Sequence, residues 1–169
     1  GLNPRVKPGG QGGIHFSLLA SPSNRDEVYV GGDRQSLSEE GGFPNFVGAE
    51  EFTGALFRGD ASVVGNGRTP SNQWEHMTDR DDIAAIPGGG TASASAPHAD
   101  ARDMELRLDG AILEADDGGI TIRTNPQDNT GDWFGLCGNL VAFESHSVAY
   151  EPVLVSIVAV WVDQKYAHN

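Results

Sequence analysis

The apolar residues of this 169-residue chain come in short runs, each soon interrupted by a turn-forming residue. The chain contains 23 Gly and 9 Pro, residue types that break helices and favour tight turns. The one helix-like stretch, residues 79–86, runs into Pro87 and three glycines. Short strands are therefore expected at residues 15–20, 27–30, 54–58, 104–108, 111–115, 120–123, 145–150 and 153–162. The hydrophobic fraction of 38% is enough for a folded core, so the sequence predicts a single all-β domain over residues 1–169.

Three parts of the chain share sequence markers in the same order. Each part begins with a histidine and reaches an aspartate 17 to 19 residues later; these markers are His15 and Asp33, His98 and Asp117, and His146 and Asp163. The first two parts then share an arginine followed by a tryptophan, at Arg58 and Trp74 and at Arg123 and Trp133. A weak internal repeat of this length is typical of β-propeller blades, which stack because one sheet cannot bury its own faces.

The repeat predicts four-stranded antiparallel blade-like units at residues 14–78 and 98–140, with a partial unit at 143–165 and a flexible linker at 87–97. A closed propeller needs at least four blades, so this chain is expected to form an incomplete propeller. The run 153–162 carries no charge and would promote aggregation if it were left at an open edge. We therefore expect another copy of the chain, or another protein chain, to complete the propeller.

Residues 98–150 resemble the bacterial sialidase-type (BNR/Asp-box) β-propeller repeat proteins, a group that includes xyloglucanase-like and sortilin-type propellers. The residues that carry the resemblance are 97–104 (PHADARDM), 114–120 (EADDGGI), Arg123 with Thr124, and Trp133. In this group a blade continues into an Asp-box turn, and the matching turn here contains Asp128, Gly131 and Trp133. Gly131 is displaced by one position, so the Asp-box is degenerate. The resemblance implies that Asp128 caps a hairpin and Trp133 packs between sheets, which identifies a fold and not a reaction.

The formal charge of −13 limits the classes of partner. Such an acidic chain repels phosphate backbones and anionic headgroups, which argues against nucleic acid and membrane surfaces, but it tolerates cations, neutral glycans and basic proteins. No apolar run approaches the roughly 20 residues of a membrane-spanning helix. The single Cys137 excludes an internal disulfide, and the start of the sequence shows no signal peptide. The expected location is extracellular or the bacterial cell envelope.

Two sets of residues are candidate ligands. His15, His98 and His146 each open the innermost strand of a unit, where a ring of histidines could bind a metal or an anion; the alternative is a structural hydrogen bond between blades. The second set is Asp33, Asp116 and Asp117, which together with Asp163, Asp100 and Asp103 could form a carboxylate cluster suited to calcium; the alternative is a turn-forming role before glycine.

No spacing in the sequence singles out a catalytic acid pair or a nucleophile with its base, so no catalytic residue is assigned. The leading hypothesis is a non-catalytic binding or interaction module of an extracellular propeller protein, with a glycan or a protein as ligand. One alternative is a fragment or relative of a sialidase- or xyloglucanase-type glycoside hydrolase. The second alternative is a structural subunit of a larger assembly.

Overall fold

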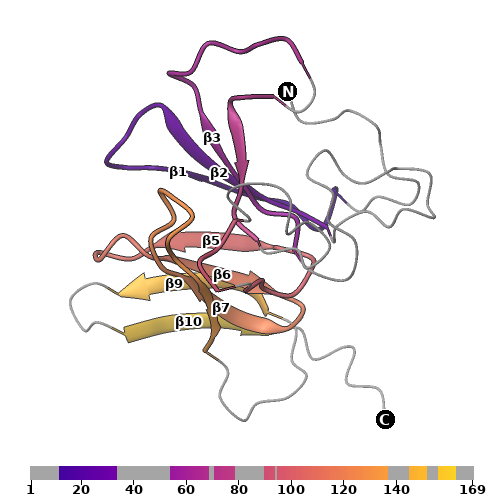
Figure 1. Cartoon of the computed structure of the whole chain (residues 1–169). Helices are drawn as coiled ribbons and strands as arrows, with labels where there is room; N and C mark the ends of the chain where they lie inside the picture. Colours follow the sequence, from indigo (N-terminus) through magenta and orange to yellow (C-terminus); the bar gives the residue numbers. More distant parts are fainter. Residues whose placement is uncertain are drawn as a thin grey trace.

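The computed structural model describes residues 12–33, 54–68, 71–78, 90–93 and 95–136, together with the backbone of two further strands at residues 145–151 and 156–162. These residues form ten β-strands and no helix, which confirms the predicted all-β class (Figure 1). The helix-like stretch at 79–86 lies outside the described residues. Within the described part of the chain, no helix is long and apolar enough to cross a membrane.

The strands form two four-stranded antiparallel sheets and one hairpin. Sheet 1 contains β1 (Ser17–Ala20), β2 (Glu27–Gly31), β3 (Phe57–Asp60) and β4 (Trp74–His76). Sheet 2 contains β5 (Asp103–Leu106), β6 (Ile112–Asp116), β7 (Gly119–Arg123) and β8 (Trp133–Gly135). The hairpin joins β9 (Ser145–Glu151) to β10 (Ser156–Val162). Each sheet is a meander, in which every strand pairs with the strand that precedes it in the sequence.

Sheet 2 is the middle of three layers (Figure 1). A core cluster joins its upper face to sheet 1, with Tyr29, Leu56 and Met77 packed against Met104, Ile112 and Trp133. The opposite face of sheet 2 buries a second apolar cluster, Ala111, Leu113, Ala115, Ile120 and Ile122. Strand β9 lies beside β5, β6 and β7 on that opposite side. The described sheets do not close into a ring.

The described part of the predicted linker is bound to the start of β8. Residues 87–89 and 94 lie outside the described residues. The hydroxyls of Ser93 and Ser95 donate to the Asp132 carboxylate at 3.0 and 2.8 Å, and the backbone N–H of Trp133 donates to the Ser95 hydroxyl at 2.9 Å. These hydrogen bonds hold the segment that precedes β5 against the edge of sheet 2.

Two buried arginines tie the turn between β7 and β8 to its surroundings. Arg58 donates to the carbonyl of Pro126 at 2.7 Å and also pairs with Glu75. Arg123 donates to the carbonyls of Gly131, Gly90 and Asp128. Because a guanidinium offers five donors in one plane, Arg123 can bind three backbone carbonyls, and Arg58 can bind one carbonyl and one carboxylate.

The register shows which repeat markers correspond. Trp74 ends a cross-strand row that contains Val28 and Gly59, and Trp133 ends the row that contains Ile112 and Arg123. Arg58 instead pairs with Tyr29, one row away. The tryptophan markers therefore occupy matching rows of the two sheets, and the arginine markers do not.

Candidate metal centre

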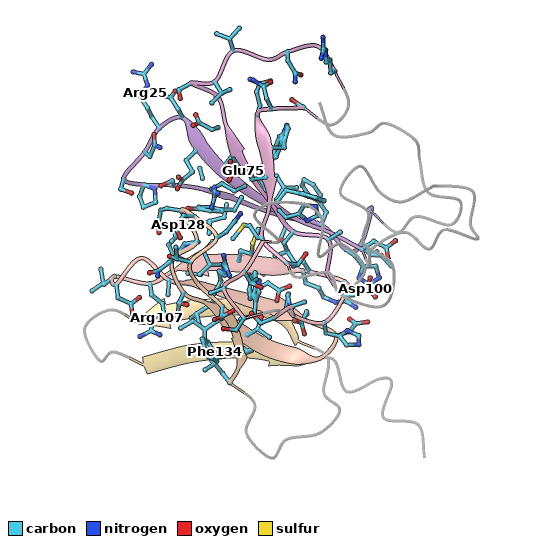
Figure 2. All side chains as sticks on the ribbon, viewed as in Figure 1. Arg25, Glu75, Asp100, Arg107, Asp128 and Phe134 are labelled. Carbon is cyan, nitrogen blue, oxygen red and sulfur yellow. The ribbon has the colours of Figure 1, made fainter. Side chains whose placement is uncertain are left out.

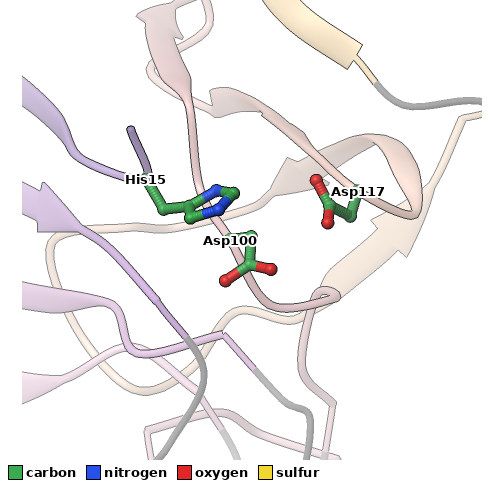
Figure 3. Close-up of side chains that lie close together, drawn as sticks. All are labelled: His15, Asp100 and Asp117. Atoms are coloured by element: carbon green, nitrogen blue, oxygen red, sulfur yellow. The ribbon is translucent and has the colours of Figure 1, made fainter. Parts of the chain in front are cut away.

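Three potential metal ligands from distant parts of the chain converge between sheets 1 and 2. His15, Asp100 and Asp117 each offer one ligand atom, and these atoms all lie within 4.8 Å of one another (Figure 3). His15 precedes β1, Asp100 precedes β5, and Asp117 lies in the turn between β6 and β7. The group therefore has one contributor from sheet 1 and two from sheet 2.

The packing of β1 beside β5 brings these residues together. The N–H of Ala101 donates to the carbonyl of Gly32 at 2.9 Å, which fastens the segment before β5 to the end of β2. Gly31 permits this approach, because a Cβ at that position would lie 2.5 Å from the Ser17 hydroxyl and 2.7 Å from the Cβ of Ala101. Asp100 has a left-handed backbone with φ of 72°, a conformation that aspartate tolerates better than most residues.

The group concentrates negative charge. Burial, followed by contact with Asp33 and the charge of Asp117, raises the pKa of Asp100 to about 6. The buried Oδ1 of Asp100 accepts no hydrogen bond from the described residues. Arg102 balances part of this charge, because its Nη2 donates to Oδ1 of Asp117 at 2.7 Å. A bound cation would offset the remaining repulsion.

The donor set indicates which cation fits. An imidazole nitrogen with two aspartates suits zinc or manganese, since calcium prefers a shell made entirely of oxygen atoms. Asp33 contacts Asp100 and could supply a further carboxylate oxygen. Calcium, the cation suggested by the carboxylates alone, fits this group less well because His15 belongs to it.

Of the predicted histidine ligands, the two whose side chains are described, His15 and His98, do not lie in the same group. His15 lies in the group and is only 4% exposed. His98 is exposed and lies against Gly118, and its Nδ1 is 3.2 Å from the carbonyl of Ala99. His98 does not belong to the three-residue group. His146 lies on β9, and its side chain is outside the described residues.

The predicted aspartate ligands divide in a similar way. Asp117 belongs to the group and Asp33 contacts it through Asp100. Asp116 is turned to the opposite side of the turn, where its Oδ1 accepts from the N–H of Gly118 at 2.6 Å. Asp103 lies on β5 and is not a member of the group, and Asp163 lies outside the described residues.

Sequence reasoning missed a buried carboxyl pair on β6. Glu114 and Asp116 are both 0% exposed and occupy alternate positions on the strand face that packs under sheet 1. Burial raises the pKa of both groups, and contact with Asp116 adds to the shift at Glu114. The Thr121 hydroxyl donates to Glu114 at 2.7 Å. The available signal was a glutamate inside an otherwise apolar strand, residues 111–115.

The turn between β7 and β8 contains the residues assigned to the degenerate Asp-box. Oδ1 of Asp128 accepts from the N–H of Thr130 at 2.7 Å and from its hydroxyl at 2.5 Å, and these hydrogen bonds lower the pKa of Asp128. A Cβ on Gly131 would lie 1.6 Å from the carbonyl oxygen of Thr124, so this position accepts no side chain. Trp133 is buried between the sheets, and its indole N–H donates to the carbonyl of Met77 at 2.5 Å.

A polar cavity of about 340 Å³ lies between this turn and sheet 1. Its walls carry four carboxylates around Arg58, namely Glu27, Asp60, Glu75 and Asp128. Figure 2 shows Glu75 on β4 and Asp128 on the β7–β8 turn. None of the residues of the metal group lines this cavity.

Comparison of the chain with family models, with curated proteins and with solved structures gave no match.

Proposed function

We propose that this chain is a non-catalytic binding module that takes up one divalent cation, zinc or manganese, between its first two sheets. The observation that carries the proposal is the convergence of His15, Asp100 and Asp117 within 4.8 Å from both sheets. A cation that binds the folded chain and not the unfolded one stabilises the fold by mass action. Its role here is to hold the ends of the first two sheets together.

The position of the group supports a binding role over a catalytic one. His15 is almost fully buried, and the polar cavity of about 340 Å³ is lined by none of the three ligands. A cation held at the group would therefore not face this cavity near Arg58. A glycan or protein ligand would bind elsewhere on the module.

The layered architecture supports the proposal that this chain is part of a propeller-like protein. Strands β1, β5 and β9 open the three layers, and β5 lies beside both of the others. In propellers the first strands of successive blades meet around the axis in this way. The extracellular or envelope location stays a prediction, with which the acidic composition agrees.

Metal binding is tested on the whole chain after treatment with a chelator. Isothermal titration with zinc, manganese and calcium chlorides near pH 7.5 should show one zinc or manganese ion per chain and weaker calcium binding. Asp100→Asn and Asp117→Asn should each weaken binding by at least about tenfold, since each removes a charged ligand. Asp26→Asn, the same chemical change at a turn before β2, should bind like the wild type. Absence of saturable binding, or equal binding by Asp100→Asn and Asp26→Asn, would refute the proposal.

A further inference from the structure

The outer face of sheet 1 is apolar. Strand pairing places Leu18, Val30 and Phe57 in one row of that face, and Val28 and Trp74 in the next. Leu18 is 60% exposed, and Phe16, which precedes β1, is 54% exposed. Tyr29 and Arg58, in the alternate row, point toward sheet 2. Phe57 is buried at 7% exposed and Val28, Val30 and Trp74 are partly buried, so the exposed apolar surface of this face lies at Leu18 and Phe16. Neighbouring exposed apolar side chains of this size favour an interaction site.

Backbone hydrogen bonds show that sheets 1 and 2 are stacked in the same orientation. The N–H of Ser21 donates to Glu27, and that of Arg107 donates to Ala111, so each sheet has the same pairing pattern between its first two strands. In L-peptide meanders, the residues of hydrogen-bonded pairs occupy one defined face. In sheet 1 this face holds Tyr29 and packs on sheet 2, whereas in sheet 2 it holds Leu113 and is turned away from sheet 1.

The exposed face of sheet 1 therefore corresponds to the face of sheet 2 that sheet 1 buries. In sheet 2 the corresponding row holds Ile112, Arg123 and Trp133, all of them buried. The matching row of sheet 1 holds Val28, Gly59 and Trp74, with the Trp74 ring lying over Gly59. Sheet 1 therefore has, on its outer side, the equivalent of the face that it covers on sheet 2. The described residues form no strand layer over this outer face.

We propose that this face docks the β9–β10 layer of a second copy of the chain. We choose this partner because the same kind of contact occurs inside the chain: sheet 1 covers the corresponding face of sheet 2, and sheet 2 packs on β9. The β9–β10 hairpin is the last layer of the stack, so in a second copy it could cover the first. Residues 156–162 of β10 carry no charge, so the last layer offers an apolar partner for an apolar face. The resulting contact is head-to-tail, and it forms a ring if the rotation closes.

The proposal is tested by size-exclusion chromatography with light scattering over a hundredfold dilution of the whole chain. The wild type should exceed the monomer mass at high concentration and dissociate on dilution. Phe16→Glu and Leu18→Glu should need at least about tenfold higher concentration to associate. Val64→Glu, at a position that is 87% exposed in the loop before β4, should associate like the wild type. A wild type that stays monomeric throughout, or Leu18→Glu and Val64→Glu variants that associate equally, would overturn the proposal.

A mixing experiment identifies the occupant. A fluorescently labelled Leu18→Glu chain keeps an intact β9–β10 layer, so it should co-sediment with unlabelled wild type and limit the size of the assemblies. If two sheet 1 faces docked on each other instead, the labelled variant would not join the wild type, and the head-to-tail proposal would be wrong. Metal binding is measured separately, because Leu18 is not a residue of the cation group.

Discussion

At the residue scale, Asp100 is the most informative side chain of the candidate site. It lies among Asp33, Asp117 and His15, and its backbone has a positive φ. Its Oδ1 accepts no hydrogen bond from the described residues, while Asp117 is balanced by Arg102. A carboxyl group in this setting is stabilised either when it holds a proton or when a cation binds beside it, because both remove the repulsion between buried negative charges.

The raised pKa of Asp100, about 6 against an ordinary value of 3.8, predicts a pH dependence of stability. Between about pH 4 and pH 6 the native state holds a proton that the unfolded state releases, so this group makes the metal-free protein less stable as pH rises. Urea unfolding from pH 4 to 7 should show that Asp100→Asn gains stability relative to the wild type as pH rises. A difference between the two proteins that does not vary with pH would contradict this assignment, and Asp26→Asn is the matched control.

At the element scale, the ends of the strands decide how closely the two sheets approach. Gly31 ends β2 against Ser17 of β1 and Ala101 before β5. The hydrogen bond from Ala101 to Gly32 then holds the segment that contains Asp100 against sheet 1. The geometry of the metal group therefore depends on a residue that provides no ligand.

Gly31→Ala should weaken both stability and cation affinity. Its Cβ would lie 2.5 Å from the Ser17 hydroxyl and 2.7 Å from the Cβ of Ala101, so the two segments must move apart. Overpacking of this kind costs about 1–3 kcal/mol of stability, and the displacement should lower zinc affinity by about tenfold. The control is Gly135→Ala on β8, where a Cβ meets nothing within 4 Å. Thermal unfolding and titration of both variants measure the two effects; equal behaviour would show that the approach of the segments is not tight.

At the scale of the whole molecule, two four-stranded sheets and a hairpin stack in one direction. This arrangement places sheet 2 between two layers and leaves an apolar face on sheet 1. It also places carboxylates in two separate regions, the metal group and the polar cavity near Arg58. The acidic character of the chain is thus distributed over sites with different surroundings.

The glycoside hydrolase alternative predicts turnover, and the binding-module proposal predicts none. Assays on aryl glycosides and sialosides, with and without added zinc, should stay at background, because the pair Glu114 and Asp116 is fully buried and the metal group does not line the cavity. Turnover above about 1 per second, a common range for enzymes, that is abolished by Asp60→Asn or Glu75→Gln would establish the hydrolase alternative. Asp109→Asn, on the exposed turn between β5 and β6, is the control.

Local sequence patterns were sufficient for the all-β class and for most of the strands. Alternating apolar residues bounded by glycine or aspartate predicted β2, β6 and β7 to within about one residue. The sequence does not predict β4 and β8, because each strand is three residues long and too short to show alternation. The arginine markers were aligned although they occupy different rows, because a shift of one residue in register reverses the face of a side chain.

The amino-acid sequence by itself determined the strands, the tight turns and the acidic character, since these depend on neighbouring residues and on composition. Only the tertiary structure decided that His15 meets Asp100 and Asp117 while His98 does not. That choice depends on β1 lying beside β5 and on the absence of a side chain at Gly31. Contacts between residues so far apart in the chain arise from the stacking of whole sheets, which local propensities do not encode.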